Sequence, residues 1–277
     1  MTRHVLPGTA IEIVNEVERG RAKHALFDFD GTISTLRQGW QDIMGPLMVE
    51  MICGGKTPPP EIEETVKRVI DETTGIQTIL QMDILVKMVR EHGMVPEDEI
   101  LDAQGYKDLY NERLMIPVRE RIARLESGGL TLEEVTVCRS LDFVRLLHER
   151  GITLYVFSGT DRQDVRHEAE VVGAAPYFQE IWGALRSFKE YSKEKVIAEL
   201  IAQHDLHGPE VLTIGDGPVE IRNGKEHGCI AIGVATDEVK RQGWNEEKRE
   251  RLLRAGADIL IPDFSEAEAL IAYLFPG

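Results

Sequence analysis

The stretch HALFDFDGT at residues 24–32 constrains the fold of this chain more than any other. An apolar run ends in Asp28 and Asp30, and the chain then turns at Gly31. Buried parallel strands that open into a site at their carboxyl end have this pattern. Because side chains alternate along a strand, the two carboxylates share one side of it and Phe29 points away. Asp and Gly also favour surface turns, but the apolar run that leads into the pair favours a buried strand with a functional tip.

The carboxylates of Asp28 and Asp30 need a positive charge between them, since two acids held close together repel each other. A hard divalent cation, most simply Mg2+, is the usual solution in proteins. We therefore expect a Mg2+ site at the end of this strand.

The composition limits the partners that we expect. The 277 residues carry 48 acidic and 32 basic side chains, which gives a net charge of −16. This charge repels nucleic acids and anionic membranes, and no basic block offsets it. Three widely separated cysteines, Cys53, Cys138 and Cys229, lack metal-ligand spacing and favour reduced thiols. The sequence also has no secretory pattern and no apolar run of transmembrane length. Together with the cysteines, these features predict a cytoplasmic protein, and we expect a monomer or a homodimer.

Strand and helix patterns alternate through the second half of the chain. This alternation predicts an α/β fold, a Rossmann-like parallel sheet with helices on both faces. After the first strand, further strands are expected at residues 152–157, 180–184, 210–214, 229–234 and 258–262, and helices at 131–150, 161–172, 192–204 and 265–273. Near the amino terminus, Thr9 and Glu12 fit a capping box, which predicts a helix over residues 10–19.

The segment between the first two expected strands has helical patterns instead. Helices are predicted at residues 40–53, 61–72, 76–92 and 97–126, the last of them interrupted near Pro117 or continuous through it. Ser127, Gly128 and Gly129 are typical of a hinge or linker. We therefore expect an α/β core domain formed by residues 1–34 and 130–277, and an inserted all-helical domain formed by residues 35–129.

Three of the expected strands end in polar residues, namely Asp28, Ser158 and Asp216. In an open α/β sheet the carboxyl ends of the strands share one edge, so these three side chains should meet there. Ser158 and Gly159 form a turn from a strand into a helix, where a hydroxyl and backbone N–H groups can hold phosphate oxygens. Ser158 as a simple helix cap is the alternative.

Two of these segments resemble signatures of the haloacid dehalogenase-like hydrolase superfamily, whose members are mostly phosphatases. DFDGT at residues 28–32 is similar to the first signature, and VFSGT at residues 156–160 is similar to the second, with Ser158 as its hydroxyl residue. An Asp at position 30 distinguishes the phosphatases of this superfamily from the dehalogenases, whose halide leaving group needs no proton.

The remaining two signatures also have counterparts, in the expected order. Lys193, at the start of a predicted helix, takes the place of the third, with Lys189 and Lys195 as alternatives. IGDGPVE at residues 214–220 is similar to the fourth, with Glu220 where many members carry Asp. Since Glu is longer than Asp, Glu220 is expected to act through a bound water.

The resemblance implies a Mg2+-dependent phosphatase. Asp28 would attack phosphorus and form an aspartyl-phosphate, while Asp30 protonates the leaving group and then activates water. Mg2+ would be bound in part by the backbone carbonyl of Asp30. The implied site residues are Asp28 and Asp30 for catalysis, Ser158, Gly159 and Lys193 for the substrate phosphate, and Asp28, Asp30, Asp216 and Glu220 for Mg2+.

The helical insert resembles the cap domain of this superfamily, which closes over the site and suits small substrates. The expected substrate is a small phosphorylated metabolite, such as a sugar phosphate or a phosphoglycolate-like acid. Candidates for substrate contact from the cap are Arg37, Gln38, Trp40 and Arg113. A phosphomutase of the same superfamily, or a ligand-binding or regulatory protein that keeps the fold without turnover, is the alternative.

Overall fold

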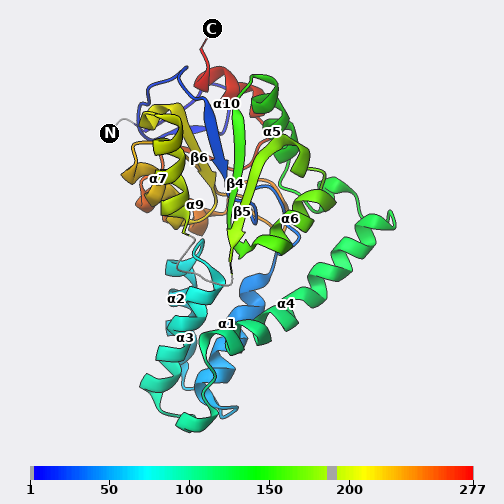
Figure 1. The fold of residues 1–277 in the computed structure, drawn as a ribbon, viewed down its shortest axis with the longest axis vertical. Helices are drawn as coiled ribbons and strands as arrows, with labels where there is room; N and C mark the ends of the chain where they lie inside the picture. The colour runs from blue at the N-terminus through cyan, green and yellow to red at the C-terminus, as the bar shows by residue number, and fades with distance from the viewer. Residues whose placement is uncertain (1–2, 186–191, 277) are drawn as a thin grey trace.

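The chain folds around one eight-stranded sheet (Figure 1). The computed structural model describes residues 3–185 and 192–276. Within these ranges the strand order is β1-β2-β8-β7-β6-β3-β4-β5. The strands are β1 His4–Val5, β2 Glu12–Ile13, β3 His24–Phe27, β4 Thr153–Asp161, β5 Phe178–Ala184, β6 Val211–Gly215, β7 Ile230–Val234 and β8 Ile259–Ile261. Among the strand pairings of the described residues, only the two at the β1 edge are antiparallel, so the predicted α/β class with a mainly parallel sheet is confirmed.

Strand β3 lies between β4 and β6 and pairs with both in parallel. Its four residues are all buried, as expected for an apolar strand covered on both faces. Phe27 is in register with Val156 of β4 and Ile214 of β6. The residues that follow these positions therefore emerge together at one edge of the sheet, as predicted.

Helices cover both faces of the sheet (Figure 1). Alternate residues of β3 pack to opposite sides, with Phe27 in the larger apolar core and Leu26 in a second apolar cluster. One face is covered by α5 Ser140–Glu149, α6 Arg162–Val171 and α10 Ala267–Leu274, and the other by α7 Lys193–His204, α8 Pro218–Glu226 and α9 Glu246–Ala255.

Four helices form a separate layer beyond the carboxyl edge of the sheet, and we call residues 40–126 the helical unit (Figure 1). Its helices are α1 Trp40–Cys53, α2 Pro60–Thr73, α3 Thr78–His92 and α4 Ala103–Glu126. Pro60 begins α2, where its missing N–H costs nothing, and Gly93 ends α3 with a positive φ. Helix α4 runs back toward the sheet and continues through Pro117, so of the two expectations the continuous helix is correct.

The predicted helix over residues 10–19 is wrong. Ile11 and Ile13 are both buried, and β2 pairs antiparallel with β8. The Thr9 hydroxyl bonds to the Leu6 carbonyl and the Ile11 N–H within a turn. The Glu12 carboxylate pairs with two arginines and is not available to cap a helix. Thr9 and Glu12, the two residues of the predicted capping box, therefore lie in a turn and in strand β2.

Other boundaries also differ from the sequence predictions. The helix expected over residues 131–150 begins only at Ser140, after a short 3-10 turn at Leu132–Glu134. The helix expected from residue 97 begins at Ala103, after a separate turn at Glu97–Glu99. Strand β4 continues beyond Ser158 to Asp161. Helices α8 and α9 were not predicted. Across the described residues, none of the helices has the length and apolar character that a membrane span requires.

Candidate active site

Strand β3 delivers Asp28 to the edge of the sheet. The ladder with β6 extends by one residue, because the Asp28 N–H donates to the Ile214 carbonyl at 2.8 Å. The Phe29 carbonyl then accepts from the N–H groups of residues 32–34, which closes a tight turn. Gly31 in this turn has a φ of 74°, and a side chain there would collide with the Asp216 carboxylate. Only glycine combines this backbone conformation with this close approach.

Lys193 lies between two acids of the site. Its Nζ atom is 3.1 Å from Asp28 Oδ2 and 3.1 Å from Glu220 Oε2. The other oxygen of Glu220 accepts from the Gly217 N–H at 2.6 Å. Ser192 caps helix α7 by accepting from the Lys195 N–H, so Lys193 is the first helical residue. The strand tip, the turn after β6 and the start of α7 therefore meet at this lysine.

Burial acts to raise the pKa of both acids, but the net pKa shifts of Asp28 and Glu220 are opposite. Burial raises the pKa of Asp28 well above its ordinary value, although the Lys193 ammonium opposes this. Burial also acts to raise the pKa of Glu220. There the Lys193 ammonium and the backbone N–H groups of Glu220 and Gly217 outweigh it, so the pKa of Glu220 lies below its ordinary value.

A second buried lysine, Lys248 on α9, holds the carboxylate that follows β6. Its Nζ is 2.8 Å from Asp216 Oδ2 and 2.8 Å from Glu238 Oε1. Burial lowers the pKa of Lys248, but the two carboxylates raise it more, so the ammonium form is favoured. Burial also raises the pKa of Asp216, with Lys248 opposing. No sequence motif pointed to this lysine.

Three of the predicted residues form a group that suits a hard cation. Carboxylate oxygens of Asp28, Asp216 and Glu220 lie within 4.8 Å of one another, and all three residues are buried. Among the described residues this is the group of acidic, His or Cys side chains with that spacing. Oxygen ligands of this kind are those that Mg2+ prefers, so the residues present fit the expected metal.

The Asp30 carboxylate has different partners. Its Oδ2 accepts from the Thr160 hydroxyl at 2.8 Å and from the Ser158 hydroxyl at 3.5 Å. Its Oδ1 lies 3.8 Å from Nε of Arg37. The Ser158 hydroxyl in turn accepts from the Thr160 N–H at 3.1 Å. Asp28 and Asp30 are thus close in sequence but face different surroundings, one among lysine and acids and the other among hydroxyls and an arginine.

Comparison with known proteins now decides the family. The sequence model of the haloacid dehalogenase-like hydrolases matches residues 25–234 of the chain. The protein belongs to the haloacid dehalogenase-like hydrolases. The match spans both the helical unit and most of the α/β core, so it includes Asp28, Ser158, Lys193 and Asp216.

Solved structures with low sequence identity share the fold of this chain. A predicted phosphoglycolate phosphatase from Haemophilus somnus has a TM-score of 0.60 at 15% identity, over 91% of this chain and 98% of that one. A β-phosphoglucomutase from Clostridium difficile has a TM-score of 0.59 at 13% identity, over 91% and 97%. A haloacid dehalogenase-like family protein from Streptococcus pneumoniae has a TM-score of 0.57 at 17% identity, over 91% and 98%. No curated protein sequence matches the chain.

In this member of the family, the loop between α2 and α3 lies against the core at the site. A Cβ placed on Gly75 would lie 2.6 Å from Glu220 Oε2, and one on Gly159 would lie 2.5 Å from the Ile76 carbonyl oxygen. Both glycines therefore permit the backbone of the helical unit to approach the core. Residues of both parts line a small cavity of about 80 Å³ that also borders Asp28, Asp30, Ser158 and Lys193.

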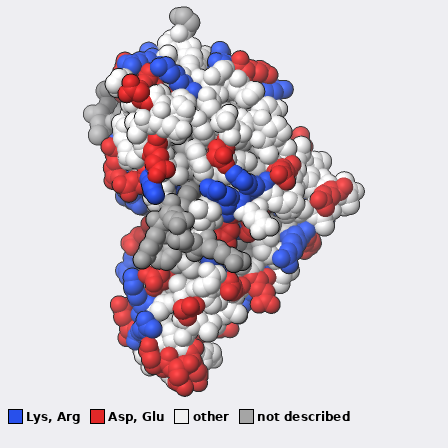
Figure 2. All heavy atoms as spheres, viewed as in Figure 1, with Lys and Arg blue, Asp and Glu red and all other residues white. Residues whose placement is uncertain are grey.

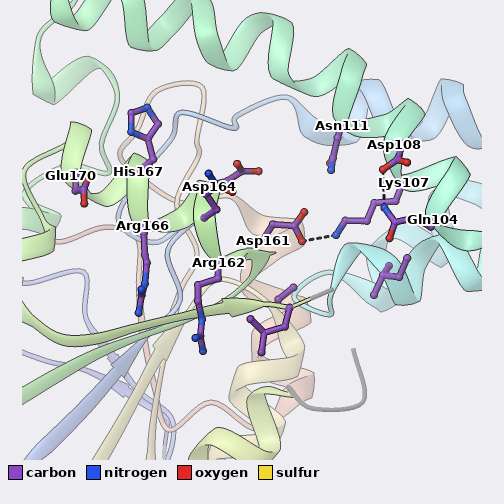
Figure 3. Close-up of a pocket in the computed structure, with 14 residues that line it drawn as sticks. Gln104, Lys107, Asp108, Asn111, Asp161, Arg162, Asp164, Arg166, His167 and Glu170 are labelled. Carbon is purple, nitrogen blue, oxygen red and sulfur yellow. Dashed lines mark hydrogen bonds and ion pairs between the residues drawn. The ribbon is translucent and has the colours of Figure 1, made fainter. Parts of the chain in front are cut away.

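A larger cleft of about 960 Å³ lies beside this cavity, between α4 and α6. Figure 3 shows Lys107 of α4 extending to Asp161 at the end of β4, and their ion pair measures 2.5 Å. The other labelled residues around the cleft include side chains of both charges, for example Arg162 and Asp164. On the face drawn in Figure 2, basic side chains are likewise interspersed with acidic ones.

Some of the weaker candidates lie away from the site. Lys195 is exposed and pairs with Glu199, and Lys189 lies outside the described residues. Arg113 pairs with Glu50 at the surface of the helical unit. Arg37 and Trp40 do border the small cavity, whereas the Gln38 amide accepts from Arg121 at 3.5 Å. Of the two lysines that the structure describes, Lys193 lies at the acids and Lys195 does not.

Sequence reasoning missed Thr160, Lys248 and Glu168. A signal for Thr160 was present, because it follows Ser158 by two residues and so shares its side of the strand. Lys248 lies 32 residues beyond Asp216 in the chain, and Glu168 meets Arg37 across 131 residues. Neither relationship has a spacing that a motif could encode.

Proposed function

We propose that this protein is a Mg2+-dependent phosphatase that hydrolyses a small phosphomonoester through an aspartyl-phosphate on Asp28. The observation that carries the proposal is the contrast between the two aspartates. Asp28 faces Lys193 and two further acids, whereas Asp30 faces the hydroxyls of Thr160 and Ser158. Paired acids in different surroundings are suited to different roles, here a nucleophile and a proton donor.

The first half-reaction forms the aspartyl-phosphate. A carboxylate oxygen of Asp28 attacks phosphorus, and the bond from phosphorus to the leaving oxygen breaks. Asp30, entering as the carboxylic acid, gives its proton to that leaving oxygen. Lys193 and Ser158, with the backbone N–H at Gly159, hold the remaining phosphate oxygens.

The second half-reaction returns the enzyme to its starting state. Asp30, now a carboxylate, takes a proton from water, whose oxygen attacks phosphorus of the aspartyl-phosphate. The bond between phosphorus and Asp28 breaks, and inorganic phosphate leaves. Asp28, Asp216 and Glu220 would hold Mg2+, together with the backbone carbonyl of Asp30. When bound, the ion supplies positive charge that offsets repulsion between the anionic nucleophile and the anionic substrate.

The proposal includes a division into two domains, a core of residues 1–34 and 130–277 and a cap of residues 35–129. The loop at Thr74–Gln77 would exclude water when the cap is closed. Residues 32–36 and Ser127 to Gly129 would form the two hinges, since both connect the cap to the core. The approach of Gly75 to Glu220 and of Ile76 to Gly159 supports this arrangement.

The size of the cavity and the similar structures support the proposed substrate class. A cavity of about 80 Å³ at Asp28 suits a small molecule. Similarity to a predicted phosphoglycolate phosphatase supports a phosphoglycolate-like acid or a sugar phosphate. The similar β-phosphoglucomutase favours a second candidate, a phosphomutase, in which the phosphoryl group returns to a sugar hydroxyl and not to water. The three unpaired cysteines support a cytoplasmic location, whereas monomer or homodimer stays a prediction.

Phosphate release from a panel of small phosphomonoesters, with Mg2+ and with a chelator, tests the proposal. We expect Mg2+-dependent release from one or two compounds. Asp28→Asn should abolish release while the thermal unfolding transition stays cooperative. Transfer of the phosphoryl group between positions of a sugar, without release, would favour the mutase. Full activity of the Asp28→Asn variant would contradict the mechanism.

A further inference from the structure

We propose that Arg37 and Glu168 act as a pair of positioning residues that orient the Asp30 carboxyl group toward the leaving oxygen. Arg37 lies between β3 and α1, and Glu168 lies on α6. This inference rests on the proposed function, because it assigns Asp30 as the proton donor. It concerns two residues that neither touch the group of acids suited to Mg2+ nor belong to any family signature described above.

The pair is buried and held in one geometry. Arg37 is 7% exposed and Glu168 is 1% exposed. Arg37 Nη2 donates to Glu168 Oε1 at 2.6 Å, and Nε donates to the same carboxylate at 3.0 Å and 3.1 Å. An arginine that binds a carboxylate through two nitrogens has little freedom to rotate.

A buried ion pair of this kind calls for an explanation other than stability. The cost of removing both charges from water roughly cancels their attraction, so an apolar pair would serve packing equally well. Burial raises the pKa of Glu168 to about 7, although Arg37 opposes this, which reflects the same cost. The position of this ion pair in the site therefore explains its presence better than a contribution to stability does.

The pair faces Asp30. Nε of the guanidinium lies 3.8 Å from Asp30 Oδ1, a buried oxygen that has no hydrogen-bond partner among the described residues. The other oxygen, Oδ2, accepts from the Thr160 hydroxyl at 2.8 Å. One side of the Asp30 carboxyl group is thus fixed by a hydroxyl, and the other faces a cation that is close enough to attract it and too far to hydrogen-bond. Because Glu168 holds Arg37 in place, the guanidinium attracts and orients the Asp30 carboxyl group without forming a hydrogen bond to it.

Leaving groups of different basicity separate this role from a general structural one. An alkoxide needs a proton from Asp30, whereas acetate leaves without one. We would measure kcat/KM with 2-phosphoglycolate and glucose 6-phosphate as alkyl phosphates, and with acetyl phosphate as the acyl phosphate. The variants are Arg37→Met, Arg37→Lys and Glu168→Gln, with Asp30→Asn as the reference. Arg113→Met is the matched control, because Arg113 forms an exposed ion pair with Glu50.

For Arg37→Met and Glu168→Gln we expect kcat/KM to fall by about 10- to 100-fold with the alkyl phosphate, and by less than about 3-fold with acetyl phosphate. The loss should lie in kcat, and Arg37→Lys should recover part of it. The control should leave both values unchanged. Equal losses with both kinds of substrate, or a change confined to KM, would overturn the inference while turnover by the wild type upholds the proposed function. No phosphate release by the wild type would overturn both.

Discussion

Lys193 Nζ lies 3.1 Å from Asp28 Oδ2, so a buried ammonium touches the carboxylate that we propose as the nucleophile. The same ammonium is 3.1 Å from Glu220. Replacement of Lys193 by Met should leave both acids without this ammonium partner. We expect kcat/KM to fall by about 100- to 1,000-fold, the loss typical for one electrostatic contact to the reacting group. Steady-state kinetics of phosphate release measure this effect.

The neighbouring Lys195 provides the control for that experiment. It lies on the same helix but is exposed and pairs with Glu199. Lys195→Met should retain the activity of the wild type. Comparable losses in both variants would indicate that the helix as a whole was disturbed and that Lys193 has no special role.

Lys248 should contribute to stability in the absence of metal. Its removal leaves the buried carboxylate of Asp216 and the half-buried carboxylate of Glu238 without their common partner. Lys248→Met should lower the free energy of unfolding by about 3 to 5 kcal/mol, since an uncompensated buried charge is costly. Bound Mg2+ stabilises the folded state, and it should raise the melting temperature more in this variant than in the wild type. Urea and thermal unfolding, each with and without Mg2+, measure both effects. An equal rise in melting temperature in both proteins would count against a cation site at Asp216.

The loop between α2 and α3, which contains Gly75, should matter more for turnover than for stability. Gly75 has a φ of 94°, and a Cβ there would lie 2.6 Å from Glu220 Oε2. Gly75→Ala should therefore push the loop away from the core and lower kcat/KM by about 10- to 100-fold, since small displacements at a reacting centre have effects of this size.

Gly93 at the end of α3 is the matched position for this comparison. Its φ is 61°, but no atom of the described residues lies within 4 Å of a Cβ placed there. Gly93→Ala carries similar backbone strain without any contact at the site. It should cost stability and leave kcat/KM unchanged. If both variants lose activity equally, closure of the loop over Glu220 is not what Gly75 provides.

The acid sensitivity of the fold should depend in part on Glu210, far from the proposed chemistry. Its carboxylate accepts from the His207 N–H at 2.8 Å and pairs with Lys23, and these contacts lower its pKa to about 2. Because the pKa in the folded state lies below the ordinary value of 4.5, its stabilising effect is complete above pH 4.5 and is lost as the pH falls toward 2.

Urea unfolding of Glu210→Gln and the wild type at a series of pH values tests this dependence. The variant should be less stable at pH 7, and the difference should shrink as the pH is lowered toward 2. Glu199→Gln removes an exposed carboxylate and serves as the control. A difference that does not change with pH would mean that the Glu210 charge has no part in it.

The site residues that lie at the ends of strands could be predicted from the sequence. Asp28, Ser158 and Asp216 follow apolar strands, and the topology of a parallel sheet brings such ends together. Lys193 was harder, because three lysines lie near the start of its helix, and the fold distinguishes it only from Lys195 among the described residues. Their roles in catalysis stay predictions.

Features that depend on side chains distant in the chain could not be predicted. Lys248 reaches Asp216, and Glu168 holds Arg37, only because α9 and α6 pack where they do. The helix predicted for residues 10–19 failed for a related reason. Burial of Ile11 and Ile13 beside β8 outweighed the local capping pattern at Thr9.

Capture of a phosphorylated Asp28 tests the central claim most directly. The enzyme would be mixed with 2-phosphoglycolate or glucose 6-phosphate and Mg2+, quenched in acid and reduced with borohydride, which converts an aspartyl-phosphate to homoserine. Mass spectrometry of the peptide over residues 24–36 should then show this change at position 28, and none with chelator or without substrate. Phosphate release that continues with Asp28 unmodified, or modification at another residue, would contradict the account.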